Sequence, residues 1–196
     1  PWQQIGSFME ALRERSGMSA RALEFLILTA ARSGEVRGMS WNEVDLNAGV
    51  WTIPAERIKA GRQHKVPLSV AAVKILKEIP PRPDSQYVFY AKRGGALSDM
   101  TLLSVLKRMD VPAVPHGFRS TFKDWARNCT RFPDEVSELA LAHVNNDATR
   151  AAYARDELLP QRTKLMTAWA AFCNKPSTQG YVVSISKPKE ITANGA

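Results

Sequence analysis

The longest apolar run in the sequence is ALEFLILTAA, residues 22–31. A membrane-spanning helix needs about 20 apolar residues, and no run in this chain is that long. A helix that is apolar on nearly all sides has no face for water and must be buried. We therefore predict a core helix that has Ser19 as its N-cap and runs through Leu26 to Ala31, followed by a turn at Ser33-Gly34.

Length and composition indicate one ordinary globular core. The chain has 196 residues, of which 44% are hydrophobic and 23% are charged, so disorder is not expected. Lys and Arg total 27 against 19 Asp and Glu, which gives a net charge of +8. The isoelectric point near 9.7 exceeds the value of about 9 that suggests a nucleic-acid partner. A membrane surface is the other anionic candidate.

The sequence contains no motif that is typical of a metal site or of a nucleotide-cofactor site. Cys129 and Cys173 are the two cysteines and lie in no CxxC spacing, so we expect no metal site and no disulfide framework. This usage fits a reducing compartment. The glycine-rich patterns GxGxxG and GxxxxGK are absent, which weighs against a nucleotide cofactor.

Short β-prone runs follow the first helices. Helical spacing at Ile5, Phe8, Met9 and Leu12 predicts a helix before the core helix. Residues 44–46, 50–53 and 65–68 are separated by turn signals at 47–49 and 60–62, which predicts a small three-stranded antiparallel sheet. Lys59 lies beside the second turn. The predicted fold class is α+β, mostly α-helical.

Further helices fill most of the remaining sequence. We predict helices at 71–79, through Leu103 to Met109 with Ser98 or Asp99 as cap, around Tyr153, and from about Leu159 to Cys173. Residues 87–99 read as a short strand and turn. The segment PDEVSELALAHV reads as a helix with Val136, Leu139, Ala140 and His143 on one face. The tail, 174–196, is expected to be mobile or to dock on a partner.

The segment VPHGFRSTFKDWA, residues 114–126, predicts an amphipathic helix. Phe118, Phe122, Trp125 and Ala126 form its apolar stripe, and Pro115 suits its start. A second face carries basic side chains at steps of three or four residues: His116, Arg119, Lys123 and Arg127. Taken alone, such a face is usually just solvated.

Other polar residues are equally ordinary when each is considered alone. Arg32 follows the apolar run, and burying its charge unpaired would be costly, so Glu35 is its expected partner. Lys59 reads as a solvated turn lysine, His143 as a core histidine and Tyr153 as a packing tyrosine.

Five segments together resemble one family. They are LTAARSGEVRGMSWNEVDL, IKAGRQHKVPLS, PHGFRSTFKDWA, ALAHVNNDATRAAYAR and RTKLMTAWAAFC, in this order and at the intervals of that family. From about Trp2 to Cys173 the chain resembles the catalytic domain of tyrosine recombinases, the phage-type integrases. It looks most like the integrases of prophages and integrative islands.

The resemblance implies a set of site residues. The first arginine of the family matches Arg32, with Glu35 as its supporting carboxylate. The His-x-x-Arg pair of the family matches His116 and Arg119. The hairpin lysine matches Lys59, and a one-turn slip would replace it by Arg62 or Lys65. The second histidine matches His143 and the nucleophile matches Tyr153. One departure is Ala30-Ala31, where many relatives have Gly and a hydrophobic residue.

The implied reaction is metal-free and cofactor-free DNA cleavage and rejoining. Tyr153 would attack a phosphodiester to give a 3′-phosphotyrosyl intermediate, with Lys59 as general acid and His116 as proton acceptor. Arg32, Arg119 and His143 would compensate the charge of the transition state. Further phosphate contacts are expected from exposed basic residues: Arg62, Lys65, Lys92, Arg93, Lys107, Arg108, Lys123 and Arg127.

The resemblance also implies an organisation and partners. Residues 1–173 would form the catalytic domain and 174–196 a tail, and the N-terminal core-binding domain of the family would be absent from this chain. The expected partners are duplex DNA at attachment sites, further copies forming a tetramer on DNA, and accessory DNA-bending or excision proteins; no membrane is expected. The expected location is the bacterial cytoplasm, at the nucleoid. Alternatives are a type IB topoisomerase-like enzyme and a non-cleaving DNA-binding regulator.

Overall fold

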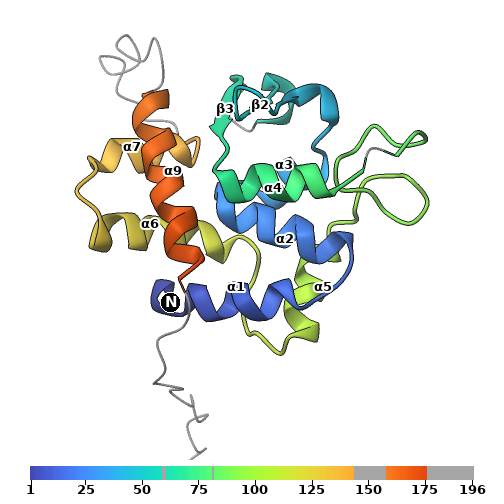
Figure 1. Ribbon diagram of the computed structural model, residues 1–196, viewed down its shortest axis with the longest axis horizontal. Helices are drawn as coiled ribbons and strands as arrows, with labels where there is room; N and C mark the ends of the chain where they lie inside the picture. Colours follow the sequence, from blue (N-terminus) through green and yellow to red (C-terminus); the bar gives the residue numbers. More distant parts are fainter. Residues whose placement is uncertain (59–60, 81, 144–157, 176–196) are drawn as a thin grey trace, which may run out of the picture.

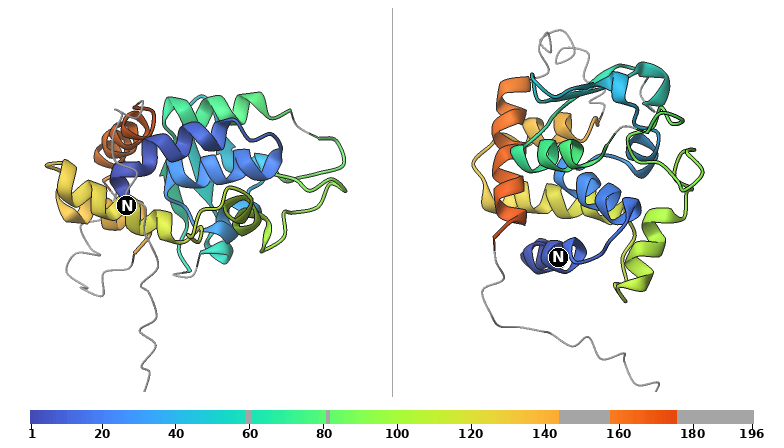
Figure 2. Two further views of the ribbon diagram at one scale, coloured as in Figure 1. Left: turned by 90° about the horizontal axis from the view of Figure 1, so that it is seen from below. Right: turned by 45° about the vertical axis from the view of Figure 1, so that its right-hand side comes forward.

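Helices surround one central helix, and a small sheet lies at one end (Figure 1). The computed structural model describes residues 1–58, 61–80, 82–143 and 158–175. The central helix is α2 (Met18–Thr29). It contacts helices that approach it from several sides (Figures 1 and 2): α1 (Ile5–Arg13), α3 (Ser33–Arg37), α4 (Val70–Glu78), α5 (Thr101–Arg108) and α9 (Leu159–Cys173). The prediction of a buried core helix is therefore confirmed.

The two ends of α2 differ from the prediction. The helix begins at Met18, directly after Gly17, whose φ is 100°. Ser19 therefore lies within the first turn and is not the N-cap. The helix ends at Thr29 because Ala30 adopts the left-handed conformation, with φ 51°.

The predicted turn at Ser33-Gly34 is wrong, because these residues begin α3. Arg32 is the N-cap of this short helix. The Glu35 carboxylate accepts a hydrogen bond from the Arg32 backbone N–H at 2.7 Å, which satisfies a donor that the helix start would otherwise leave unpaired. Arg32 thus starts a new helix and does not end the apolar one.

The three-stranded antiparallel sheet is confirmed. Its strands are β1 (Val44–Asp45), β2 (Val50–Ile53) and β3 (His64–Pro67), in the order β1-β2-β3. Val44 pairs with Trp51, and Ile53 pairs with His64. Trp51 and Ile53 alternate inward along β2 and are fully buried, as a half-buried strand requires. One short 3₁₀ turn, Trp41–Glu43, precedes β1, and a second, Ala55–Arg57, lies in the hairpin between β2 and β3. Another, Trp2–Gln4, precedes α1.

The region between the sheet and α6 is less regular than predicted. The helix predicted at 71–79 is α4, and its N-cap Ser69 accepts from Ala72 N–H at 3.3 Å. The strand expected at 87–99 is reduced to isolated bridges, Ser40 with Tyr87 and Tyr90 with Ala96.

Neither predicted cap of α5 is used. The N-cap is Met100, without a side-chain hydrogen bond. The Asp99 carboxylate instead forms an ion pair with Arg37, and Ser98 Oγ lies 2.9 Å from the Thr101 hydroxyl. The Asp99 carboxylate, which the local pattern predicted as the cap, therefore pairs with Arg37 of another helix.

Helices α6 (Gly117–Cys129), α7 (Asp134–Ala140) and α9 pack together on one side of α2 (Figure 1). The contact between α6 and α9 is aromatic: Phe122, Trp125, Trp169 and Phe172. The indole N–H of Trp169 also donates to the Ile27 carbonyl of α2 at 2.8 Å. This bond fixes α9 against the helix whose end carries the candidate site.

Helix α7 is shorter than predicted. It ends at Ala140, and Ala142 has a positive φ of 48°. His143 therefore lies beyond the helix and is exposed, so the prediction that it shares the apolar face of Val136 is wrong. The bounds predicted for the last helix, 159–173, agree with α9.

Some predictions fall outside the described residues: Lys59, the short helix around Tyr153, and nearly all of the 174–196 tail. Within the described ranges, no helix has the length and apolarity needed to cross a membrane.

Candidate active site

Arg119 is the structural centre of the candidate site. It lies in the first turn of α6, and only 4% of its surface is exposed. Its Nη1 donates to the Ala30 carbonyl at 2.6 Å, and its Nη2 donates to the Leu141 carbonyl at 2.6 Å. One guanidinium group therefore holds the end of α2 next to the end of α7.

Both carbonyls lie at left-handed turns. Ala30 itself has a φ of 51°, and Ala142, the residue after Leu141, has a φ of 48°. This conformation favours glycine because a Cβ crowds the backbone, at a cost of about 1–2 kcal/mol. The departure noted in the sequence, Ala30 where many relatives of the resembled family have Gly, thus falls at a position with a physical preference for Gly. The backbone is therefore strained at both turns whose carbonyls accept hydrogen bonds from Arg119.

Arg32 lies close enough to Arg119 to influence it electrostatically. Burial and, after it, the charge of Arg32 lower the pKa of Arg119 to about 10, while Glu35 and Glu138 oppose this shift. Arg119 stays charged at neutral pH. Two like charges held together in this way create a site that favours an anion.

Glu35 holds Arg32 in place. Its Oε1 accepts from Arg32 Nη1 at 2.9 Å, and its Oε2 accepts the Arg32 backbone N–H. The Glu35 side chain is buried, whereas 28% of the Arg32 side chain remains exposed. The predicted pairing is confirmed, and the partly exposed guanidinium remains accessible to a ligand.

His143 contacts the site through both ring nitrogens. Nε2 lies 3.3 Å from Arg119 Nη2, and Nδ1 lies 2.6 Å from Glu138 Oε2. The side chain is 46% exposed. The structure thus brings together Arg119, Arg32 and His143, three residues that are far apart in the sequence.

Lys123 was predicted to contact DNA, and the structure corrects this prediction. The residue is 8% exposed. Its ammonium group binds Glu138 Oε1 at 2.6 Å, Asp134 Oδ1 at 2.8 Å and Ser137 Oγ at 2.7 Å. The reason is tertiary: α7 packs on α6 and presents two carboxylates to the lysine.

Glu138 is ionised because of these neighbours. Partial burial by itself would raise its pKa, but hydrogen bonds from Lys123 and His143 outweigh burial and hold the pKa below its ordinary value. Its two oxygens are divided between the two donors, Oε1 toward Lys123 and Oε2 toward His143.

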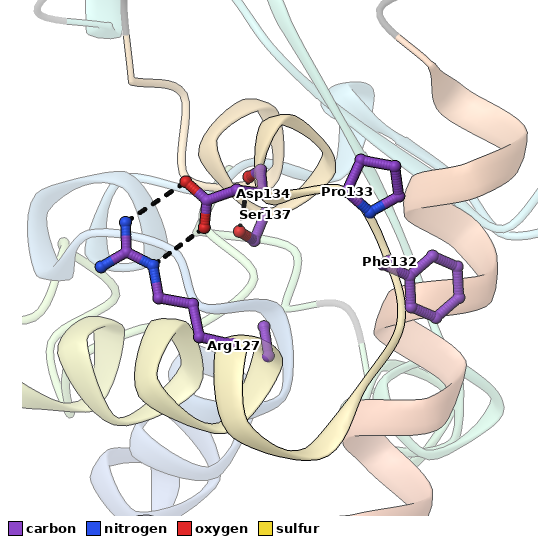
Figure 3. A pocket seen from close by; sticks show the side chains of 6 residues that line it. Arg127, Phe132, Pro133, Asp134 and Ser137 are labelled. Atoms are coloured by element: carbon purple, nitrogen blue, oxygen red, sulfur yellow. Dashed lines mark hydrogen bonds and ion pairs between the residues drawn. The ribbon is translucent and has the colours of Figure 1, made fainter.

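Arg127 is exposed, but its guanidinium is engaged. Nε and Nη2 donate to Asp134 Oδ1 and Oδ2 at 2.8 and 3.2 Å (Figure 3). These bonds, together with Lys123, hold the pKa of Asp134 well below its usual range. The pair borders a pocket of about 160 Å³ between α6 and α7, lined by Ala126, Arg127, Phe132, Pro133, Asp134 and Ser137. A DNA contact by Arg127 remains a prediction.

His116 lies one helical turn before Arg119, but its side chain is exposed whereas that of Arg119 is buried. It is the N-cap of α6. The Arg119 backbone N–H donates to the His116 carbonyl at 3.1 Å, but the His116 side chain forms no hydrogen bond with the residues that the structure describes. The apolar stripe predicted for this helix is confirmed, since Phe118, Phe122 and Trp125 are buried.

The other predicted basic residues lie on loops, on the hairpin and in the last turn of α5. All of them are exposed: Arg62, Lys65, Lys92, Arg93, Lys107 and Arg108. Their roles as phosphate contacts remain predictions, as do those of Lys59 and Tyr153, which lie outside the described residues. Among the described residues, no three His, Cys, Asp or Glu side chains are grouped so that they could hold a metal ion.

Sequence reasoning missed a layer of residues beneath the site. Arg57 forms an ion pair with Glu43 and donates to the Glu35 carbonyl. His64 is buried on β3, and burial, followed by the charge of Arg162, lowers its pKa to about 4. Arg162 is fully buried on α9 and donates to the Lys65 carbonyl at 2.7 Å. His64 stands inside a quoted motif, but no local pattern distinguishes it from a surface histidine.

Comparison with known proteins gives one consistent family. The model of the phage integrase family matches residues 2–158. Prophage integrase IntA of Escherichia coli K12 is 37% identical over 174 residues, covering 85% of this chain and 42% of that protein. The integrase of Shigella phage Sf6 is 31% identical over 178 residues, covering 87% of this chain and 46% of that protein. The chain therefore spans less than half of the length of these relatives.

Solved structures agree on the fold. A lambda integrase(75–356) dimer bound to a COC′ core site matches with a TM-score of 0.54 and 17% identity, over 74% of this chain and 55% of that one. XerA recombinase matches with a TM-score of 0.54 and 16% identity, over 78% and 61%. The family match over residues 2–158 and the 37% identity to IntA show that the chain belongs to the phage integrase family.

Proposed function

We propose that this chain is the catalytic part of a site-specific DNA recombinase that integrates or excises a mobile element through a 3′-phosphotyrosyl intermediate. The observation that carries the proposal is the convergence of Arg119, Arg32 and His143 at one partly exposed position. Family membership supports it. So do its relatives, prophage integrase IntA and the integrase of phage Sf6, and a lambda integrase tetramer solved on a Holliday junction.

The proposed reaction begins at a DNA phosphodiester. The phenolic oxygen of Tyr153 bonds to phosphorus, and the bond from phosphorus to the 5′-oxygen breaks. Lys59 gives a proton to that leaving oxygen, and His116 accepts the phenolic proton. A 5′-hydroxyl of a second strand then reverses the step, so the energy of the broken bond is kept in the covalent link.

The described residues would act on the transition state. Negative charge grows on the non-bridging oxygens, and preorganised donors are most effective where that charge develops. The Nε–H and the second Nη1 hydrogen of Arg119 form no hydrogen bond with the described residues. Together with the exposed part of Arg32, they are the groups that would bind these oxygens. The net charge of +8 supports attraction of the duplex.

We further propose that residues 1–173 form the catalytic unit and that several copies assemble as a tetramer on two attachment sites. Exposed Arg62, Lys65, Lys92 and Arg93 would contact flanking phosphates. Accessory DNA-bending or excision proteins and a location at the bacterial nucleoid belong to the same proposal.

The test uses the natural protein that carries this chain and a nicked duplex with the candidate attachment site. The nick lets a short fragment diffuse away, so the covalent intermediate accumulates. We expect a protein–DNA adduct that resists denaturation with wild type and is missing with Tyr153→Phe. An adduct that persists in Tyr153→Phe would refute the assignment.

Two other experimental outcomes would each support one of the alternative functions. Relaxation of supercoiled DNA by a monomer, without strand exchange between two sites, would indicate a topoisomerase-like enzyme. Specific DNA binding without any adduct would indicate a non-cleaving regulator.

A further inference from the structure

The contacts of His143 on its far side lead to a residue that the resemblance did not assign. Its Nε2 faces Arg119, and its Nδ1 is bound at 2.6 Å by the Glu138 carboxylate. An ionised carboxylate accepts hydrogen bonds and donates none, so Nδ1 carries the proton of this bond. The Nε2 of a neutral ring is then the acceptor for Arg119.

Glu138 is itself immobilised. Its second oxygen binds Lys123 Nζ at 2.6 Å, and the ammonium group is held by Asp134 and Ser137 in addition. The Lys123 side chain is only 10% exposed. A carboxylate held between a buried cation and a histidine has little freedom to rotate, and it therefore orients the ring. This arrangement matches the outer groups that orient histidine ligands at other sites.

The backbone strengthens the same arrangement. The His143 N–H donates to the Glu138 carbonyl at 3.0 Å across the end of α7. Glu138 and His143 are thus tied by two bonds, one through the main chain and one through the side chains. A 46% exposed side chain would otherwise sample several rotamers.

We propose that Glu138, clamped by Lys123, is the positioning residue for His143, holding its Nε2 toward Arg119 and the phosphate. This inference rests on the proposed DNA-cleavage function. When phosphate binds, the ring takes up a proton from solvent at Nε2, which its 46% exposed side chain allows. It then donates from both nitrogens, to Glu138 and to the non-bridging oxygen, and the carboxylate balances the charge of the ring. Glu138 touches no reacting atom in this arrangement.

The kinetic test measures the single-turnover rate of adduct formation on the nicked duplex. We expect Glu138→Gln to slow this step on the order of 10- to 100-fold, with little change in duplex affinity, because one amide oxygen cannot accept from both Lys123 and His143. Glu138→Asp should recover part of the rate. The matched control is Glu135→Gln, the same change on the same helix, and it should react like wild type.

A double-mutant cycle separates positioning from a general effect on structure. In a His143→Ala background, Glu138→Gln should cause no further loss of rate, because the residue it positions is gone. An equal loss in both backgrounds, or a wild-type rate for Glu138→Gln, would overturn the proposal.

A second measurement needs no DNA. The ¹⁵N shifts of the His143 ring, assigned by comparison with His143→Ala, should report a proton on Nδ1 in wild type and a redistribution toward Nε2 in Glu138→Ala. Identical ring shifts in both proteins would also overturn the proposal. If wild type forms no Tyr153-dependent adduct, the cleavage function fails, and the ring shifts still decide whether Glu138 orients His143.

Discussion

Arg119 Nη2 lies 3.3 Å from His143 Nε2 while the same guanidinium group bonds the carbonyls of Ala30 and Leu141. The Arg119 side chain, which would bind a phosphate in the proposed function, therefore also connects the ends of α2 and α7. The proposed catalytic role and the local structure thus depend on the same residue, so a substitution that keeps its charge is as informative as one that removes it.

Arg119→Lys should reduce the rate of adduct formation on the order of 10²–10³-fold. A lysine keeps the charge, but its compact ammonium group cannot span both carbonyls and still offer planar donors to phosphate. Duplex affinity, measured by fluorescence anisotropy, should change little. Arg131→Lys, at an exposed residue, is the control and should behave as wild type. Equal losses in cleavage and affinity would show that Arg119 is simply a phosphate-binding residue.

The free energy of unfolding should fall between pH 6.5 and pH 5 because of His64. Burial, then Arg162, lowers its pKa to about 4, below the ordinary value near 6.5. In this window the unfolded chain binds a proton that the folded chain excludes, so stability rises with pH and is fully present above about 6.5. The expected loss from pH 7 to pH 5 is about 2 kcal/mol.

Urea unfolding at several pH values measures this loss. In His64→Asn the slope between pH 6.5 and 5 should flatten, even if the variant is less stable overall. Three carboxylates have lowered pKa values, so their contribution to the free energy of unfolding is lost only below this pH range: Asp84, Asp134 and Glu138. They therefore do not hide the effect of His64 between pH 6.5 and pH 5. An unchanged slope in His64→Asn would mean that another group titrates.

Ala30→Gly should stabilise the fold by about 0.5–1 kcal/mol. Glycine removes the left-handed cost of about 1–2 kcal/mol, which exceeds the extra freedom it gives to the unfolded chain, about 0.4–1 kcal/mol. Differential scanning calorimetry should show a melting temperature higher by about 1–4 °C.

The neighbouring substitution is a matched control. Ala31 is buried and has no positive φ, so Ala31→Gly should be destabilising by about 0.5–1 kcal/mol. Two changes of the same kind at adjacent positions should thus have opposite signs. If Ala30→Gly also lowers the melting temperature, strain at this turn is not the dominant effect.

Arg57→Met should destabilise the protein by about 2 kcal/mol. It removes the cationic partner of Glu43, whose side chain is only 9% exposed, and the bond to the Glu35 carbonyl. Arg62→Met, on the same hairpin at an exposed residue, should change stability by less than about 0.5 kcal/mol. Chemical denaturation compares the two, and equal effects would contradict a structural role for Arg57.

The parts of the fold that were predicted correctly depend on local patterns. The β-prone run at residues 50–53, bounded by turn signals, was sufficient to identify β2, and the helical pattern was sufficient to identify α9 with its bounds. The end of α7 was missed because it depends on Arg119 drawing in the Leu141 carbonyl, an interaction across 22 residues of sequence.

The same distinction applies to the candidate site. Arg32 with Glu35 was predictable because three residues separate them on one short helix. The role of Lys123 was not, since its partners Asp134 and Glu138 belong to the next helix. A basic residue on a helical stripe reads as solvated until a neighbouring helix presents carboxylates to it.

The sequence by itself determined which chemistry-bearing side chains are present, that a fully apolar helix must be buried, and which family the ordered motifs resemble. Only the tertiary structure decided which of those side chains face one another: Arg119 between two helix ends, His143 beyond its helix, and Lys123 turned inward onto Glu138. The physical reason is that residue type and spacing act over a few residues, whereas burial and ion pairing depend on whatever element packs alongside.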